Sequence, residues 1–397
     1  MSFSRRGLLA GAGLTVIARG AAPAAKSREL SRELTRDELP TPCMVLDLDM
    51  FDANVRHMAD HSKAAGISVR PHVKIHKSAD IAKRQQTAGA IGVTTATIAE
   101  AELMSAAGIK GVLWTMQPAG KHKIQRAVAL SRRDPHFMLV ADDPITADML
   151  DEAAAAQGTK VRVVVDIFAG LTRHGIAGGA EAFALAQKIE QSKNLKFGGL
   201  MAYSGIASHT KGWEKRREQS MKDIAGLKET AEMCRKSGLT PGILTGGSTG
   251  TYNIDPGHLT ELQAGSYIFM DTGYTKIGSK DQAGDRYSDF KSSLTVLTTV
   301  VSARHKGQVT IDAGNKALLR PTDEVKGHPR MIIENQGAEY GIVKFNGDRE
   351  LKLGERIELY PTNLDMSTNV YDKYYIARGD RIIDAWPIMG RAGAAQR

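Results

Sequence analysis

The chain has 397 residues and a formal net charge of +9 at pH 7; 42 % of its residues are hydrophobic and 24 % are charged. This length predicts about two domains, and this composition excludes a disordered chain. The sequence contains no collagen-like triplets, heptads or short repeats, which excludes fibrous and solenoid folds. The basic residues are dispersed, so the charge does not indicate nucleic-acid binding and suits small anionic ligands.

The first 25 residues have the pattern of a twin-arginine signal peptide. Arg5 and Arg6 precede a weakly apolar run at 8–18, and a stretch rich in Ala, Gly and Pro follows at 20–25. The apolar run is shorter than the about 20 residues that span a bilayer. We therefore expect export to the periplasm without a retained membrane anchor. A basic tail on a cytoplasmic protein is the alternative.

From residue 42 onward, short apolar runs alternate with amphipathic stretches. The predicted strands are 43–48, 67–70, 91–95, 111–115, 136–141, 161–166, 197–203 and 242–245, and the predicted helices are 52–65, 78–87, 98–107, 123–131, 145–157, 180–191 and 214–237. Eight strands with helical connections predict a TIM-like (β/α)8 barrel of parallel strands. An open doubly wound sheet is the alternative, but no Gly-x-Gly-x-x-Gly follows the first strand to indicate a dinucleotide site.

After about residue 285 the pattern changes to strands separated by turns. The predicted strands are 293–302, 308–311, 338–344, 356–360, 373–377 and 381–386. We expect a barrel domain at 38–284, followed by a C-terminal mostly-β domain at 285–397 that residues 26–37 complete.

Two loops that follow predicted barrel strands carry basic residues at the expected active-site face. Lys74 follows the strand 67–70 within Arg-Pro-His-Val-Lys-Ile-His-Lys. A lysine beside other cations can form a Schiff base with a carbonyl compound. Arg173 follows the strand 161–166 and can reach an anionic oxygen at the barrel mouth. A solvated basic turn and a surface salt bridge are the structural alternatives.

A third loop, after the strand 242–245, is rich in glycine and hydroxyl side chains. Its central residues are Gly246, Gly247, Ser248, Thr249 and Gly250. Such a loop can surround an oxyanion with backbone N–H groups, although a flexible linker has the same composition. A Schiff-base lysine and a phosphate site in one barrel together indicate pyridoxal phosphate (PLP).

The order and spacing of these motifs resemble the fold-type III PLP enzymes of the D-threonine aldolase and D-serine dehydratase-like family, which are relatives of alanine racemase. Besides the Lys74 motif and the glycine-rich loop, the resemblance rests on Pro40-Thr41-Pro42, Asp47, Asn54 and the segments 261–267, 312–316, 369–372 and 386–388. It extends from about residue 38 to the C-terminus.

The resemblance implies roles for the residues at matching positions. Lys74 would form the Schiff base, Arg173 would bond the phenolic oxygen of PLP, and Tyr203 would lie close to the ring. The five loop residues Gly246 to Gly250 would hold the phosphate. His209 would serve as a base or as a ligand, with a surface histidine as the alternative.

The resemblance also implies a divalent metal beside the cofactor. In the family, a His and an acid or Cys two residues later hold this metal, and the matching positions here are Asn363 and Asp365. A neutral amide oxygen suits Mn²⁺, Mg²⁺ or Ca²⁺ better than Zn²⁺. The sequence therefore departs from the family at the first metal ligand.

The implied activity is that of a PLP-dependent lyase on a small D-3-hydroxy amino acid. The first expectation is a D-threonine aldolase, which cleaves its substrate to glycine and an aldehyde. The alternatives are dehydration of D-serine or D-threo-3-hydroxyaspartate, amino-acid racemisation, or PLP binding without turnover. The resemblance further implies a homodimer, and we expect no nucleic-acid partner and no membrane association after export.

Overall fold

The structure is a computed structural model that describes residues 34–280, 284, 286–319, 324–335, 337–347 and 349–391. The predicted signal peptide at 1–25 lies outside the described residues. Within these ranges, no helix combines the length and hydrophobicity needed to cross a bilayer.

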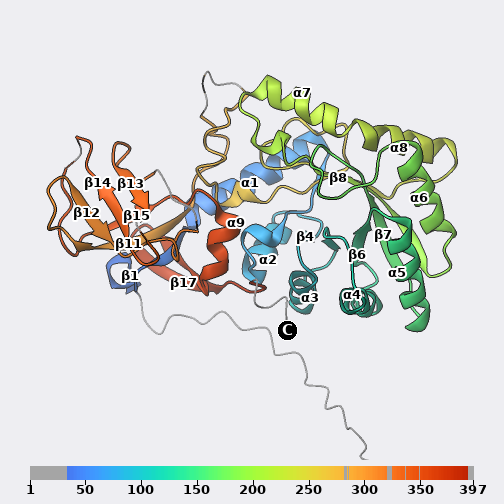
Figure 1. The fold of residues 1–397 in the computed structure, drawn as a ribbon, viewed down its shortest axis with the longest axis horizontal. Helices are drawn as coiled ribbons and strands as arrows, with labels where there is room; N and C mark the ends of the chain where they lie inside the picture. Colours follow the sequence, from blue (N-terminus) through green and yellow to red (C-terminus); the bar gives the residue numbers. More distant parts are fainter. Residues whose placement is uncertain are drawn as a thin grey trace, which may run out of the picture.

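Eight parallel strands form the sheet of the larger domain (Figure 1). They are β3 (Ser68–Val69), β4 (Val93–Thr95), β5 (Val112–Trp114), β6 (Met138–Ala141), β7 (Val161–Asp166), β8 (Leu195–Ala202), β9 (Ile243–Gly246) and β10 (Glu261–Leu262). The spatial order is β3-β10-β9-β8-β7-β6-β5-β4, and a parallel bridge between His72 and Thr94 joins the two ends. The sheet therefore curls into the predicted TIM-like α/β architecture.

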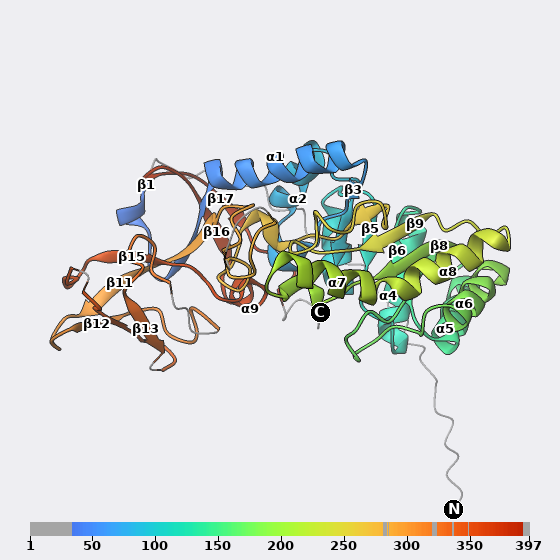
Figure 2. The same cartoon turned by 90° about the horizontal axis from the view of Figure 1, so that it is seen from above.

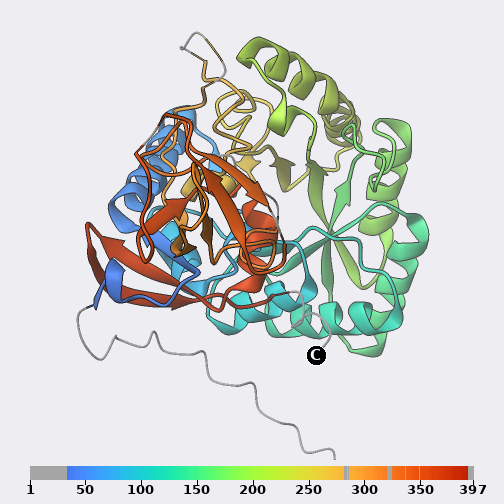
Figure 3. The same cartoon turned by 60° about the vertical axis from the view of Figure 1, so that its left-hand side comes forward.

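Helices cover the outside of this curled sheet (Figure 3). They are α1 (Leu48–Ala65), α2 (Ala79–Thr87), α3 (Ile98–Ala106), α4 (Lys121–Arg133), α5 (Pro144–Ala156), α6 (Ala180–Gln191), α7 (Trp213–Asp223) and α8 (Ala225–Lys236). Local sequence sets their ends: the Asp47 side chain caps α1, and Gly66 ends it at φ +63°. The single helix predicted at 214–237 is wrong, because Ile224 separates α7 from α8.

The C-terminal domain is mostly β, as predicted, and contains a nine-stranded sheet. Its strands are β1 (Leu34–Thr35), β2 (Cys43–Asp47), β11 (Leu294–Ser302), β12 (Gln308–Ile311), β13 (Ile332–Asn335), β14 (Gly341–Lys344), β15 (Arg356–Leu359), β16 (Lys373–Arg378) and β17 (Arg381–Pro387). A short helix, α9 (Leu364–Ser367), lies between β15 and β16 and faces the barrel (Figure 1).

The assignment of 43–48 as the first barrel strand is wrong. This segment forms β2, which pairs antiparallel with β11 and parallel with β16 in the C-terminal sheet. It is buried on both faces, so its sequence looks like that of a central barrel strand. The eighth barrel strand is instead β10, which apolar patterning missed because it is two residues long and includes the charged Glu261.

The two domains share one hydrophobic core. Helix α1 starts directly after β2 and packs against both β16 and β3 (Figure 2). Phe51 on α1 contacts Trp386 on β17 edge to face, with ring centroids 6.0 Å apart. Side chains from both domains, among them Trp114 and Tyr374, belong to the same buried cluster. This shared core fixes the C-terminal domain against the barrel.

A buried ion pair joins the strand ends at β3 and β10. Arg70 Nε and Nη2 lie 2.8 Å from the two carboxylate oxygens of Glu261, and Arg70 Nη1 donates to Gly111 O. Both charged residues are at most 5 % exposed. A Cβ on Gly92 or Gly111 would collide with the backbone of the other segment and crowd Arg70, so glycine is required at both.

We predict that Glu261→Ala lowers the free energy of unfolding by about 3–5 kcal/mol, because it leaves Arg70 buried without its counter-ion. Glu339→Ala is the matched control, since Glu339 pairs with Lys316 at the surface, where both side chains are more than half exposed; we expect a loss within about 1 kcal/mol. Urea and thermal unfolding measure both variants. Equal losses in the two variants would contradict a stabilising role for the buried pair.

Candidate active site

The predicted site residues come together at the carboxyl ends of the barrel strands. Lys74 lies on a 3-10 turn (Val73–Ile75) after β3, and Arg173 lies in the loop after β7. Tyr203 follows β8 directly, and the glycine-rich loop follows β9. The C-terminal domain contributes Asp365 from α9. Both domains therefore build the site.

Two adjoining cavities surround Lys74. The larger one, of about 380 Å³, is lined by His72, Lys74, Ala96, Thr115, Met116, Gln117, Arg173, His174, Met201, Tyr203 and Gln263. The smaller one, of about 100 Å³, is lined by His72, Lys74, Ile75, Tyr203, His209, Ser248, Thr249, Gln263, Gly265, Ser266, Asp271, Tyr274, Asn363 and Asp365. The four residues common to both are His72, Lys74, Tyr203 and Gln263. Lys74 thus faces a roomy cavity on one side and the glycine-rich loop on the other.

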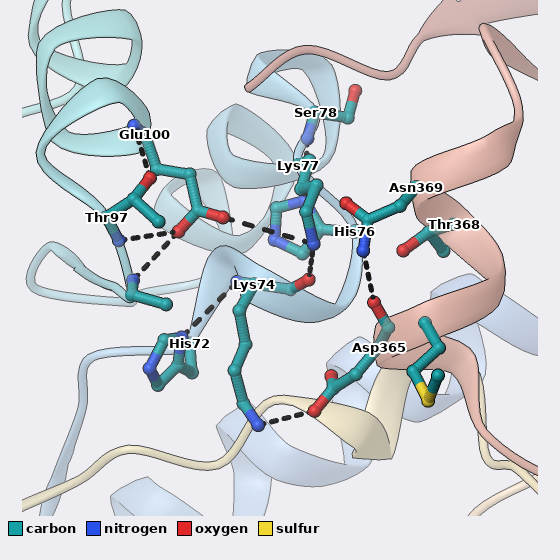
Figure 4. Close-up of polar contacts among 12 residues, drawn as sticks. His72, Lys74, His76, Lys77, Ser78, Thr97, Glu100, Asp365, Thr368 and Asn369 are labelled. Atoms are coloured by element: carbon teal, nitrogen blue, oxygen red, sulfur yellow. Dashed lines mark hydrogen bonds and ion pairs between the residues drawn. The ribbon is translucent and has the colours of Figure 1, made fainter. Parts of the chain in front are cut away.

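The amine of Lys74 is held by a carboxylate from the other domain. Lys74 Nζ donates to Asp365 Oδ2 at 2.5 Å (Figure 4). Burial, the largest single cause, lowers the pKa of Lys74, but the charges of Asp365 and Tyr203 and the hydrogen bond to Asp365 together outweigh it, so the pKa is raised above its ordinary value. A protonated amine cannot attack a carbonyl. The Asp365 contact must therefore loosen before Lys74 can form a Schiff base.

A neighbouring lysine, which is buried, supports the backbone of Lys74. Lys77 Nζ donates to the carbonyl oxygen of Lys74 and lies 3.9 Å from Glu100 Oε1 (Figure 4). Lys77 has a φ of +50° in the left-handed region, and its own carbonyl accepts from Met389 N at 2.7 Å. His72 Nδ1 accepts from the amide of Lys74 at 3.3 Å. These contacts fix the turn that presents the amine.

The glycine-rich loop has the shape of an anion site. Thr251 Oγ1 accepts from Ser248 N at 3.0 Å and donates to the buried Asp255 at 2.5 Å, which fixes the turn. Within the described part of the chain, the amides of Thr249 and Gly250 donate no hydrogen bond. Unpaired amides beside a cavity that Ser248 and Thr249 line fit a phosphate group.

The loop glycines are required by close packing. Gly246 ends β9, and a Cβ there would collide with Ala202 O on the neighbouring strand. Gly247 has a φ of +71°. A Cβ on Gly250 would collide with Ser208 O. The loop therefore lies against the turn that follows Tyr203, which brings its amides to the cavity that Lys74 lines.

His209 lines the smaller cavity, although more than a third of its surface remains exposed. Its ring lies 4.4 Å from that of Tyr274, measured between centroids. Burial, helped by the positive charge of Lys74, lowers the pKa of His209. The neutral imidazole can accept a proton at neutral pH, which is what a base at this position requires.

Asn363 and Asp365 offer few free ligand atoms to a metal. Asn363 Oδ1 caps α9 by accepting from Met366 N at 3.0 Å. Asp365 Oδ2 bonds Lys74, and its Oδ1 is buried without a partner. Among the residues described, no group of three or more His, Cys, Asp or Glu side chains gathers as a metal site. This donor set does not fit Zn²⁺, which takes three or four protein ligands.

Sequence reasoning missed two polar residues of the site, Gln263 and Asp271. Gln263 donates to Thr245 Oγ1 at 2.9 Å and faces both cavities. It directly follows β10, so recognising that strand would have placed it at the active-site face. Asp271 accepts from the amide of Tyr274 at 3.1 Å, and nothing in the local sequence indicates its burial.

Asp271 predicts a pH dependence of stability. Burial raises its pKa from 3.8 to about 7, so the folded chain holds this proton more tightly than the unfolded chain. The resulting stabilisation is complete below pH about 4 and is lost as the pH rises through about 7. Asp271→Asn cannot titrate at this position. We therefore expect its free energy of unfolding, measured relative to that of the native protein, to increase by about 2–3 kcal/mol between pH 5 and pH 8.5.

The exposed Asp37→Asn is the control for this experiment and should follow the native pH profile. A profile of Asp271→Asn that is parallel to the native one would mean that the carboxyl group is ionised throughout this range.

Comparisons with known proteins identify the family of this chain. The model "Alanine racemase, N-terminal domain" matches residues 46–273, and the model "Putative serine dehydratase domain" matches residues 293–377. The chain is 32 % identical to the 3-hydroxy-D-aspartate aldolase of Paracoccus denitrificans (strain Pd 1222), over 90 % of this chain and 94 % of that protein. It is 27 % identical to the D-threo-3-hydroxyaspartate dehydratase of Delftia sp. (strain HT23), over 88 % of this chain and 97 % of that one.

A solved structure gives the same result. The crystal structure of D-threonine aldolase from Filomicrobium marinum superposes with a TM-score of 0.84 at 31 % identity, and the match covers 94 % of this chain and 99 % of that one. The curled sheet, Lys74 and the glycine-rich loop all lie in the segment that matches the alanine racemase domain. The chain is a PLP-dependent lyase of the fold-type III family, with an alanine racemase N-terminal domain followed by a D-serine dehydratase-like domain.

Proposed function

We propose that the protein cleaves the Cα–Cβ bond of a D-3-hydroxy amino acid and releases glycine and an aldehyde. Two aldolases, one acting on 3-hydroxy-D-aspartate and one on D-threonine, are 31–32 % identical to this chain, against 27 % for the dehydratase. The observation that carries the proposal is Asp365 Oδ1, a buried acceptor without a partner in the cavity that Lys74 lines. Cleavage requires such an acceptor for the proton of the substrate's β-hydroxyl group.

Each residue of the site has a proposed role that follows from its position. Lys74 would hold the cofactor covalently, Thr249 and Gly250 would offer amides to its phosphate, and Arg173 would bind its phenolic oxygen. When bound, PLP supplies the electron sink that stabilises negative charge at the substrate Cα. Asp365 Oδ1 and the neutral His209 are the two acceptors placed to take the hydroxyl proton.

Dehydration of a D-3-hydroxy amino acid is the second candidate. Lys74 is paired with a carboxylate that can receive its proton, which suits removal of the α-proton by the lysine amine. Loss of the β-hydroxyl would then give ammonia and a 2-oxo acid in place of glycine and an aldehyde. The two reactions share every residue of the site, so the products decide between them.

We expect the purified protein, supplied with PLP, to form glycine and an aldehyde from D-threonine or 3-hydroxy-D-aspartate, and to leave the L-isomers unchanged. Lys74→Ala should lose at least about a thousandfold in rate, because its covalent role has no substitute. Borohydride reduction should attach the cofactor to the native chain at Lys74 and leave Lys74→Ala unlabelled. Lys121→Ala, on the outer helix α4, is the control and should behave as native.

The outcomes separate the candidates. If the same substrates gave ammonia and a 2-oxo acid, the reaction would be dehydration and the proposal of cleavage would be rejected. Labelling of Lys74 without turnover of any D-3-hydroxy amino acid would reject both activities and leave a PLP-binding protein.

A metal would change the chemistry of this site, and the chain allows a direct test. Asn363→His should raise the affinity for Mn²⁺ or Zn²⁺ at least tenfold in calorimetric titration, because imidazole adds a strong ligand two residues from Asp365. Asn346→His, an exposed substitution elsewhere in the C-terminal domain, controls for an added histidine. The same affinity in both variants would show that Asn363 does not belong to a metal site.

Two further proposals rest on the sequence and on the resemblance. The paired Arg5 and Arg6 support export to the periplasm, with a cytoplasmic protein as the alternative. The family resemblance supports a homodimer. Both stay predictions.

A further inference from the structure

The loop that presents Arg173 leaves and re-enters the barrel at a fixed base. Ile176 N donates to Asp166 O at 3.0 Å, and Phe168 N donates to Ile176 O at 2.9 Å. Gly175 closes the loop at a φ of +102°, where a Cβ would collide with the backbone of Phe168. The ends of the loop are therefore held by backbone bonds, and the side chains at its tip are left to be placed by other contacts.

A series of polar contacts connects the end of β7 to Arg173. Asp166 is 1 % exposed, and its Oδ2 accepts from Gln117 Nε2 at 2.7 Å. His174 Nδ1 lies 2.6 Å from the same oxygen. His174 Nε2 in turn accepts from Arg173 Nε at 3.0 Å. With its proton on Nδ1 the neutral imidazole faces the carboxylate and leaves Nε2 to accept from Arg173, so His174 links a buried carboxylate to the guanidinium group. The hydrogen bond and charge of Asp166 raise the pKa of His174, so this neutral form is the one present at alkaline pH.

The series of polar contacts ends at the guanidinium group of Arg173, which has free donors. Arg173 lines the larger cavity together with Lys74, and its carbon Cζ lies 5.8 Å from the ring centroid of Tyr203. Within the described residues, its terminal amines donate no hydrogen bond. No acidic side chain lines the described part of this cavity. A guanidinium group in such surroundings is arranged to bind an anionic oxygen that the protein itself does not supply.

We propose that His174, held by Asp166, is a positioning residue that fixes the guanidinium of Arg173 toward the anionic phenolic oxygen of the cofactor. The proposal rests on the proposed function, because that function places PLP beside Arg173. Asp166 acts from outside the cavity: its carboxylate is buried behind the imidazole and does not appear in the lining. The side chain of Arg173 is itself exposed, so without His174 it would sample several rotamers and lose directionality.

The test measures cofactor binding in place of turnover. PLP is titrated into the PLP-free chain and its variants at pH 8.5, and the visible absorbance of the bound cofactor is then followed against pH. His174→Leu should weaken PLP binding about tenfold, as expected for the loss of one hydrogen bond to a charged group, and should change the pH profile of the absorbance. His174→Gln retains an acceptor for Arg173 Nε and a donor for Asp166, so it should restore most of the affinity.

Two controls exclude a general effect on the fold. His136→Leu removes an exposed histidine of the same domain and should leave both readouts unchanged. Thermal unfolding of the PLP-free chains should give similar midpoints for native, His174→Leu and His174→Gln, because the backbone bonds at the base of the loop remain.

A double-mutant cycle with Arg173→Ala decides whether His174 acts through the arginine. If it does, His174→Leu should cause no further loss of PLP affinity once Arg173 is absent. If the losses of PLP affinity in the two single variants multiplied in the double variant, the proposal would be overturned. An unchanged PLP affinity in His174→Leu alone would also overturn it. Failure of the native chain to bind PLP would overturn the proposed function as well, whereas native binding with multiplying losses would overturn the positioning role only.

Discussion

The buried Arg70–Glu261 pair, which holds the neighbouring strands β3 and β10 together, is the constraint on which the site depends. The pair joins the end of β3 to β10, and the chain continues from each partner directly into the site. Lys74 lies four residues after Arg70, and Gln263 lies two residues after Glu261. Because the two buried charges neutralise each other through two direct contacts, the strand ends are held in one arrangement, and the lysine turn starts from a fixed point.

The second constraint is that the site spans two domains. The barrel provides the amine of Lys74, the glycine-rich loop and Arg173, and α9 of the C-terminal domain provides the carboxylate that bonds Lys74. The shared core around Phe51 and Trp386 holds α9 over the barrel mouth. A PLP lyase needs both an attachment point for the cofactor and a proton acceptor near the substrate, and in the proposed function the two come from different domains.

Each functional cation has its own buried carboxylate behind it. Lys77 supports the backbone of Lys74 and faces Glu100, while His174 connects Arg173 to Asp166. Such supporting contacts hold catalytic groups within the narrow geometry that catalysis requires. At the position where the resemblance implied a metal-binding histidine, Asn363 caps α9. The departure in sequence thus has a structural role, which is to fix the helix that carries Asp365.

The sequence by itself determined the fold class, the lysine loop, the arginine loop and the glycine-rich loop, because each follows a strand with a clear apolar pattern and parallel strands place such loops at one face. It could not determine which sheet β2 joins, since a strand buried on both faces has the same pattern in either domain. It missed β10 and Gln263, because a two-residue strand with a charged residue has no apolar pattern. Only the tertiary structure decided that Asp365 reaches Lys74 and that Asp166 lies behind His174, because these contacts join residues whose distance in space the local sequence does not encode.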